Sequence, residues 1–162
     1  MEQFKYLKSE SCSFTGHRDM ATEKIRTVKT KLKAAIEQCY DEGITNFVCG
    51  MALGFDMLGA ETVLAMKDEY PDLTLTAVVP FRGQADRWAI SNQRRYESIL
   101  DEADQVIVMS EHFFKGCEMK RNTYMVEHSC RLISYFNGEE HGGTFFTYRS
   151  AKERKMPIIN LF

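Results

Sequence analysis

Three short glycine-containing turns in this sequence have the residue types and the position that phosphate binding needs. They are Thr15-Gly16-His17-Arg18, Cys49-Gly50-Met51-Ala52-Leu53-Gly54-Phe55-Asp56 and Gly142-Gly143-Thr144. Each turn comes after an apolar, strand-like run. A glycine lets the backbone approach a phosphate closely, and free amides at the start of a helix point toward such an anion. The turns therefore predict binding of a nucleotide or of a related phosphorylated ligand.

Side chains in the first two turns add donors to this predicted site. Thr15 offers a hydroxyl and Arg18 a forked donor that matches phosphate, although Arg18 could instead be a surface residue paired with a helix acid. His17 is either a ligand contact or a solvent-facing turn residue. Gly50 and Gly54 are expected to allow close backbone approach rather than to serve packing alone. A Gly54→Val variant should accordingly lose binding without unfolding.

The second turn also brings a carboxylate to the start of a helix. Met51 and Ala52 belong to the same loop, and Asp56 lies in the first helical turn, where an acid can cap free amides or contact a ligand. Glu61 lies deeper in the helix, where a solvated or ion-paired side chain is expected. Asp56 and Glu61 are the catalytic candidates if the protein hydrolyses its ligand.

Residues at the start of two later helices could complete the site. Arg121 could neutralise a second phosphate and Asn122 could contact a base or sugar edge; the alternative is a capping Asn beside an exposed Arg. Gly142-Gly143-Thr144 could form a second anion site or a flexible turn. Phe81, just past a strand end, could stack on a base.

Other residues are given structural roles or are excluded. Trp88 and Tyr96 have helical spacing and are expected in the core. The His and Cys residues near the fourth helix match no compact zinc site, so no metal is predicted. The sequence contains no P-loop Gly-Lys-Ser/Thr motif, which argues against P-loop ATP hydrolysis.

The elements that must position these turns alternate along the chain. Strands are expected at residues 11–15, 46–49, 73–79, 105–109, 131–136 and 157–161. Helices are expected from Asp19 or Thr22 to Gly43, from residue 55 to 70 before Pro71, and at residues 84–101, 118–129 and 144–155. This alternation predicts one α/β domain over residues 1–162, a Rossmann-like three-layer α/β/α fold with a mainly parallel sheet. In such sheets ligands bind at the carboxyl ends of the strands, where the turns lie.

Composition sets the remaining expectations. The 162 residues carry a net charge of −2, which argues against nucleic acid as a partner. No apolar run reaches the roughly 18 residues that span a bilayer, and no secretory signal is seen, so a cytoplasmic protein without a membrane partner is expected. The five cysteines are expected to be reduced thiols. A homo-oligomer is compatible with the sequence.

The ordered set of motifs resembles the YpsA-like family of the SLOG superfamily. The set comprises Thr15-Gly16-His17-Arg18, Gly50 to Asp56, Pro80-Phe81, Arg121-Asn122 with Met125-Val126, Tyr135-Phe136-Asn137-Gly138 and Gly142-Gly143-Thr144. The resemblance implies a Rossmann-like fold that binds a nucleotide or a nucleotide-derived ligand such as ADP-ribose or NAD, with no other cofactor implied. Relatives in the LOG group cleave a ribosyl bond of nucleotides, and DprA relatives bind single-stranded DNA.

Two departures from the family pattern bear on function. Cys49 stands where the family usually has the first glycine of a Gly-Gly pair. Gly142-Gly143-Thr144 is not followed by the glutamate of LOG enzymes, and Glu153 is the first acid after it. Cleavage through an oxocarbenium-like state needs a nearby carboxylate. A sensor or regulatory module that binds a nucleotide is therefore the leading hypothesis; a nucleotide N-glycosidic hydrolase and a single-stranded DNA-binding protein are the alternatives.

Overall fold

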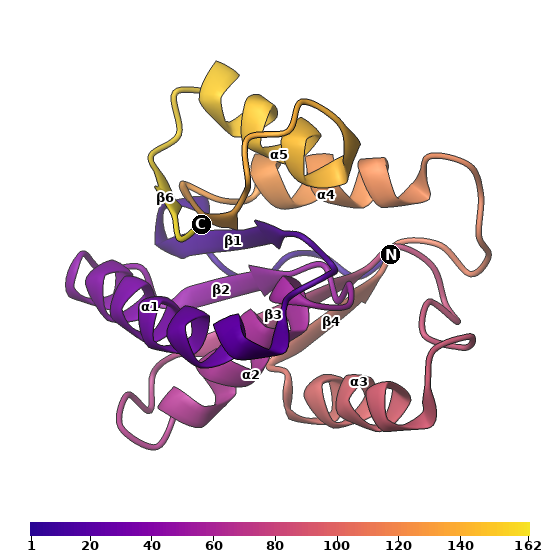
Figure 1. The fold of residues 1–162 in the computed structure, drawn as a ribbon, viewed down its shortest axis with the longest axis horizontal. Helices are drawn as coiled ribbons and strands as arrows, with labels where there is room; N and C mark the ends of the chain where they lie inside the picture. The colour runs from indigo at the N-terminus through magenta and orange to yellow at the C-terminus, as the bar shows by residue number, and fades with distance from the viewer.

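The computed structural model describes residues 1–162, and its six strands form one parallel sheet (Figure 1). In chain order the strands are β1 Ser11–Gly16, β2 Asn46–Cys49, β3 Thr74–Val79, β4 Gln105–Val108, β5 Arg131–Tyr135 and β6 Ile158–Asn160. They lie side by side in the order β4-β3-β2-β1-β5-β6. The chain moves outward from β1 to β4 and then returns to the other side of β1, so strand order reverses between β1 and β5. The predicted parallel α/β architecture is confirmed.

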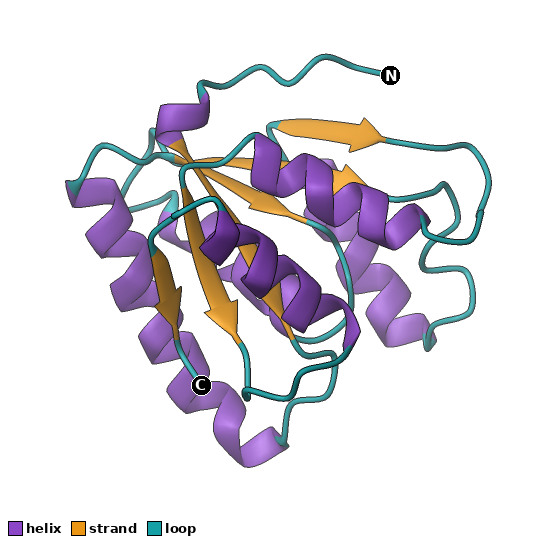
Figure 2. Cartoon of the chain, turned by 90° about the horizontal axis from the view of Figure 1, so that it is seen from above, coloured by secondary structure: helices purple, strands orange, loops and turns teal.

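Helices cover both faces of the sheet (Figure 1). A short 3-10 turn, η1 Lys8–Glu10, precedes β1, and five α-helices follow: α1 Thr22–Asp41, α2 Phe55–Met66, α3 Ile90–Glu102, α4 Cys117–Glu127 and α5 Gly142–Glu153. The first three pack on one face, and α4 and α5 pack together on the other. Figure 2 shows the strands fanning out with the twist of a parallel sheet. None of the helices is long and apolar enough to cross a membrane.

The helix ends correct several boundaries predicted from the sequence. Neither Asp19 nor Thr22 caps α1; Ala21 is the N-cap residue and provides no side-chain hydrogen bond. Gly43, at φ +87°, ends this helix as expected. The second helix ends at Met66 rather than residue 70, because the chain tightens there into i→i+3 turns.

The third helix begins at Ile90, six residues later than the predicted start. Gly83 has φ +92°, and successive i→i+3 turns fill the segment from Gly83 to Trp88. The Gln93 side chain donates to the carbonyl oxygens of Asp86 (3.0 Å) and Trp88 (3.1 Å) and so holds these turns against the helix. Tyr96 is buried, which confirms the core role expected of it. Trp88 packs edge-to-face on Tyr96 but is only half-buried at the border of the core, because the chain at this position forms tight turns rather than a helix.

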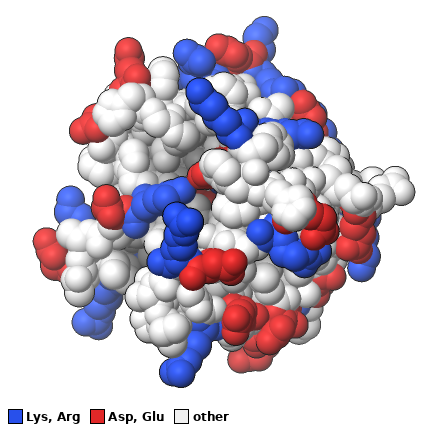
Figure 3. Space-filling model, turned by 90° about the vertical axis from the view of Figure 1, so that its right-hand side faces the viewer, with Lys and Arg blue, Asp and Glu red and all other residues white.

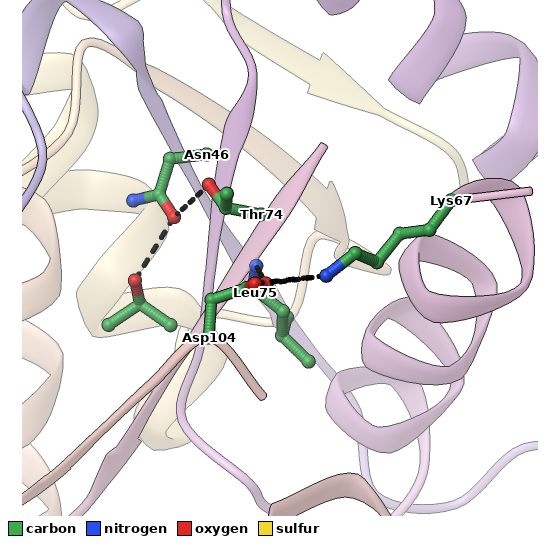
Figure 4. A network of polar contacts seen from close by, with 6 residues as sticks. Asn46, Lys67, Thr74, Leu75 and Asp104 are labelled. Carbon is green, nitrogen blue, oxygen red and sulfur yellow. Dashed lines mark hydrogen bonds and ion pairs between the residues drawn. The ribbon is translucent and has the colours of Figure 1, made fainter. Parts of the chain in front are cut away.

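A buried amide fixes the register of three strands at the amino ends of the sheet (Figure 4). Asn46, on β2, donates from Nδ2 to Ser11 Oγ of β1 at 3.0 Å. Its Oδ1 accepts from Thr74 and Thr76 of β3, each at 3.0 Å. Satisfied buried polar groups of this kind specify one pairing of the strands. Because the register is fixed at the amino ends, the carboxyl ends of β1, β2 and β3 also have fixed positions relative to one another.

Candidate ligand-binding site

A cavity of about 520 Å³ opens at the carboxyl ends of β1, β2 and β5, beside the point where strand order reverses. This is where open α/β sheets bind ligands. Figure 3 faces the side of the molecule toward which the strands of Figure 1 point, and basic and acidic side chains are interspersed on it. The cavity is lined by Thr15, Gly16, His17, Arg18, Ala52, Asp56, Phe113, Lys115, Gly116, Glu118, Met119, Arg121, Asn122, Glu139, His141, Gly142, Gly143 and Thr144.

Three helices begin at the wall of this cavity. Asp56 lies in the first turn of α2, Gly116 immediately precedes α4, and Gly142 opens α5. None of these helices has a side-chain cap on its first amides. The positive ends of three helix dipoles therefore surround one space, an arrangement that favours an anion.

A buried arginine supplies positive charge inside the cavity wall. The Arg121 residue is only 4% exposed, which contradicts the alternative of an exposed Arg at this position. Its Nη1 donates to the Gly50 carbonyl oxygen, and its Nε donates to Asn122 Oδ1 at 2.7 Å. Its Nη2 has no hydrogen-bond partner within the chain. The guanidinium is thus fixed at two positions and keeps its Nη2 group for a ligand.

Asp56 is a buried carboxylate beside this cation. Burial raises the pKa of Asp56 from its ordinary value of 3.8 to about 6, and the Arg121 guanidinium and the Ala52 backbone amide lower it in part. At neutral pH the carboxyl is therefore mainly ionised, but a small change in its surroundings is enough to protonate it. A group with such a pKa can exchange a proton or accept from hydroxyl groups of a ligand.

Further hydrogen-bonding groups in the lining have no partner within the chain. The hydroxyls of Thr15 and Thr144 and the Nδ2 group of Asn122 face the cavity without an intramolecular hydrogen bond. Lys115 is exposed and makes no ion pair. These groups add unsatisfied donors to the positive helix ends around the cavity, a combination that suits a phosphate or a ribose.

Two side chains of the first turn are engaged with other elements. Arg18 pairs with Glu118 of α4 at 2.9 Å, as the surface-Arg alternative proposed, and it also lines the cavity. The His17 Nε2 accepts from the Asn137 backbone amide at 3.0 Å. The ring therefore connects the loops that follow β1 and β5, rather than pointing only to solvent.

Comparison with known proteins identifies the family. The model of the YpsA SLOG family matches residues 12–159, almost the whole chain. The chain belongs to this family. UPF0398 proteins are similar to it: one from Bacillus cereus strain B4264 is 28% identical over 132 residues, 80% of this chain and 72% of the relative. One from Bacillus velezensis is 26% identical over 132 residues, 80% of this chain and 70% of the relative.

A solved structure shares the fold of this YpsA-family chain. DNA processing protein A from Helicobacter pylori, described with its single-stranded DNA binding mode, matches with a TM-score of 0.64 and 15% sequence identity. The alignment covers 93% of this chain and 64% of that protein. At this identity the likeness shows a common fold.

Some residues predicted for the site lie outside the cavity. Gly50, Met51 and Gly54 shape the loop behind the lining. A Cβ on Gly54, at φ +83°, would overlap the Arg18 carbonyl oxygen, so this glycine lets the first two turns pack against each other. The structure therefore argues against Gly54→Val as a variant that keeps the fold.

Phe81 and Glu61 also lie elsewhere. The Phe81 ring lies in a neighbouring cavity, edge-to-face with Phe113 at 5.3 Å. Glu61 forms an ion pair with Arg95 at 2.6 Å, as its ion-paired alternative proposed, and it lines a separate surface hollow. Of the two catalytic candidates, Asp56 lies in the cavity at the strand ends and Glu61 does not.

Cys49 shows how this chain accommodates its departure from the family's Gly-Gly pair. Its thiol is fully buried, donates to the Asp56 carbonyl oxygen at 3.2 Å and accepts from the Met51 amide at 3.3 Å. These contacts close the loop over the start of α2 and hold Met51 at φ +62°, a conformation that is uncommon for a residue with a side chain. The turn is therefore formed with a cysteine at this position.

Sequence reasoning missed the part of the lining contributed by the loop before α4 and by the first turn of that helix. The residues concerned are Phe113, Lys115, Gly116, Glu118 and Met119. They reach the cavity although they follow β4, which lies at the edge of the sheet, away from β1 and β5. The signal was the exposed pair Phe113-Phe114 followed by Lys115-Gly116 at a strand-to-helix junction. Glu139 and His141 were missed as well; they form an exposed pair at 3.0 Å just before α5.

Proposed function

We propose that the cavity at the ends of β1, β2 and β5 binds the phosphate of a nucleotide or nucleotide-derived ligand of the ADP-ribose or NAD kind. The protein would act as a sensor or regulatory module, as one domain in the cytoplasm. The observation that carries this proposal is the convergence of three uncapped helix starts on a cavity walled by the buried Arg121. Membership of the SLOG family supports it.

The lining assigns roles within this proposal. The amides of Gly142 and Gly143 and the hydroxyl of Thr144 would bind phosphate oxygens at the start of α5. The free Nη2 group of Arg121 would neutralise charge on the opposite wall, and Asn122 would donate to a sugar or base edge. Asp56 would accept from ribose hydroxyls.

Single-stranded DNA binding is the second candidate function. The expectation that a nucleic acid is not a partner rested on net charge, and the fold shared with DNA processing protein A leaves that expectation without support. The exposed Lys115 and Phe113 at the cavity mouth are residue types that bind phosphate backbones and stack on bases. A salt-dependent gel shift with a labelled single strand tests this candidate; no shift at low salt would remove it.

Hydrolysis of an N-glycosidic bond is a third candidate and depends on Asp56. A carboxyl with a pKa near 6 suits acid–base work at neutral pH. Release of ribose phosphate from AMP, abolished in Asp56→Asn, would establish this activity. No release from common nucleotides would leave binding as the function.

The binding proposal is tested with Gly143→Ala. Gly143 is not in the positive-φ region, and a Cβ there would meet only Asn122 Nδ2, at 3.6 Å. The domain should therefore fold normally, since alanine also favours a helix more than glycine does. The added methyl would nevertheless stand between the backbone and a phosphate. Thermal shift and calorimetry with AMP, ADP-ribose, NAD and cyclic dinucleotides would be compared for wild type and variant.

We expect at least one of these ligands to stabilise the wild-type protein and to bind Gly143→Ala at least tenfold more weakly. Ser150→Ala, in the same helix but outside the cavity, serves as the control and should bind as wild type does. If Gly143→Ala keeps full affinity, phosphate does not bind at the start of α5. A panel without any hit would contradict the proposal.

A further inference from the structure

A second cavity, of about 670 Å³, lies alongside the first and shares part of its wall. Arg18, Phe113 and Glu118 line both cavities. The remaining lining of the second comes mainly from the segment after β3, residues 81–88, and from Glu111 and His112 after β4. A ligand bound in the first cavity can therefore extend past the Arg18–Glu118 pair into the second.

Aromatic rings give the second cavity a surface on which a planar group can stack. Phe81 and Phe113 lie edge-to-face, with centroids 5.3 Å apart and planes at 81°. Phe113 is 63% exposed, so much of its ring is available to a ligand. Trp88 forms another part of the wall and is held from behind by Tyr96. Stacking on such rings is how proteins hold bases without reading their sequence.

Positive charge accompanies these rings. Arg87 is exposed and makes no ion pair, whereas Arg82 is held by Glu111 through two hydrogen bonds of 2.6 and 3.1 Å. The Arg18–Glu118 pair on the shared wall is solvent-exposed, at 62% and 43% of the side chains. Solvent-exposed ion pairs contribute little free energy, so Arg18 can leave Glu118 and bind a phosphate that lies where the two cavities meet.

We propose that the second cavity is a base-binding subsite, and that the ligand has two nucleoside units joined through phosphate. The first cavity holds the phosphate and one nucleoside, Arg18 contacts the linking phosphate, and the second base stacks on Phe81 and Phe113. The inference rests on the proposed nucleotide-binding function and specifies its ligand class. Two sources share this chemistry, a free dinucleotide and a single strand of nucleic acid.

The test compares ligands that contain one nucleoside with ligands that contain two. Calorimetry would measure the affinity of AMP, of NAD, of the dinucleotide pApA and of a twelve-residue oligo(dA). NAD or pApA should bind at least tenfold more tightly than AMP. Phe81→Ala removes a ring that lines the second cavity and not the first, and it should reduce that dinucleotide affinity about tenfold and leave AMP within twofold.

Two further variants separate stacking from misfolding. Arg87→Gln changes an exposed, unpaired side chain and should weaken the two-nucleoside ligand severalfold without changing AMP binding. Phe114→Ala is the matched control, because this exposed ring neighbours Phe113 but lines neither cavity. It should bind every ligand as wild type does.

The outcomes separate this inference from the proposed function. If AMP binds and neither NAD nor pApA exceeds it by more than twofold, the second subsite is refuted while nucleotide binding stands. If no probe binds, both fail. Oligo(dA) binding at least tenfold tighter than both dinucleotides, with a steep salt dependence, would identify a nucleic acid strand as the source. Equal or weaker binding of the strand would identify a free dinucleotide.

Discussion

The Arg121 guanidinium donates a hydrogen bond to the Gly50 carbonyl oxygen and fills the space into which a side chain at position 50 would point. A Cβ on Gly50 would lie 2.9 Å from the guanidinium atoms. The contact ties α4 to the loop after β2, 71 residues away in the chain. The glycine at this position is therefore required by a neighbouring arginine, whether or not a ligand approaches it.

Gly50→Ala should lower the free energy of unfolding by about 1–3 kcal/mol, because Arg121 must leave its acceptor inside the protein. Gly50 has no positive φ, so alanine adds no backbone strain of its own. Urea denaturation of Gly50→Ala, Arg121→Ala and the double variant would measure the coupling. In the Arg121→Ala background the alanine at position 50 should have almost no effect. Fully additive effects would contradict the proposed contact.

Gly54→Ala should destabilise the protein more than Gly43→Ala does. Both glycines have φ near +85°, at +83° and +87°, so both variants acquire backbone strain of about 1 kcal/mol or more. A Cβ at Gly43 meets nothing within 4 Å, whereas one at Gly54 overlaps the Arg18 backbone. Urea denaturation measures the free energy of unfolding of each variant, and the difference between the two losses reports the packing of the first two turns against each other. Equal losses would mean that these turns can separate freely.

Glu118→Gln and Arg18→Gln should change ligand affinity in opposite directions. Glu118 places a negative charge on the cavity wall and engages Arg18, so its neutralisation should tighten binding of a phosphorylated ligand severalfold. Arg18→Gln removes a donor and should weaken binding. Both side chains are exposed, so stability should change by less than about 1 kcal/mol.

Calorimetry on both variants, at low and at physiological salt, checks this expectation. Glu127→Gln is the control, because Glu127 lies at the far end of α4 and pairs loosely with Arg154 at 3.9 Å. It should leave affinity unchanged. If Arg18→Gln and Glu118→Gln weaken binding equally, the pair positions the loops and Arg18 does not contact the ligand.

The sequence was sufficient to predict the sheet because its four inner strands, β1, β2, β3 and β5, are short runs buried on both sides. Residues 46–49, for example, are fully buried, and each glycine turn follows a strand end as parallel topology requires. The start of α3 was not predictable from periodicity, since Gln93 and Gly83 impose a series of tight turns on a segment with helical composition. Local pattern does not encode such side-chain contacts.

The site was predictable only where its residues follow strands directly. Thr15, Asp56 and Gly143 were recognised because they stand at strand ends or helix starts. The contribution of Lys115 and Glu118 depends on where α4 crosses the sheet, which requires the strand order β4-β3-β2-β1-β5-β6. The packing role of Gly54 likewise depends on Arg18, 36 positions earlier in the chain, and no feature of either segment alone indicates that contact.

Asp56→Asn should change how stability depends on pH. Burial raises the folded-state pKa of Asp56 to about 6, above the value of about 3.9 for an unfolded chain. The fold thus favours the protonated acid, and the stability that this acid contributes is full below about pH 4 and is lost as pH rises through about 6. Asparagine resembles the protonated acid and keeps that contribution at every pH. Relative to wild type, Asp56→Asn should gain about 2–3 kcal/mol of stability between pH 4 and pH 7.

Urea denaturation of both proteins at several pH values between 4 and 7.5 measures this difference, in which the titration of all other groups cancels. Asp101→Asn, at an exposed position without an ion pair, should give a profile parallel to that of wild type. A parallel profile for Asp56→Asn would mean that water reaches the carboxylate and that its pKa is ordinary. The expected divergence would instead establish a carboxyl whose pKa, already near 6, is raised further by the negative charge of a bound phosphate, so that it takes up a proton from solvent on binding. NAD, whose pyrophosphate keeps its charge over this range, should then bind wild type more tightly below pH 6, while Asp56→Asn shows no such dependence.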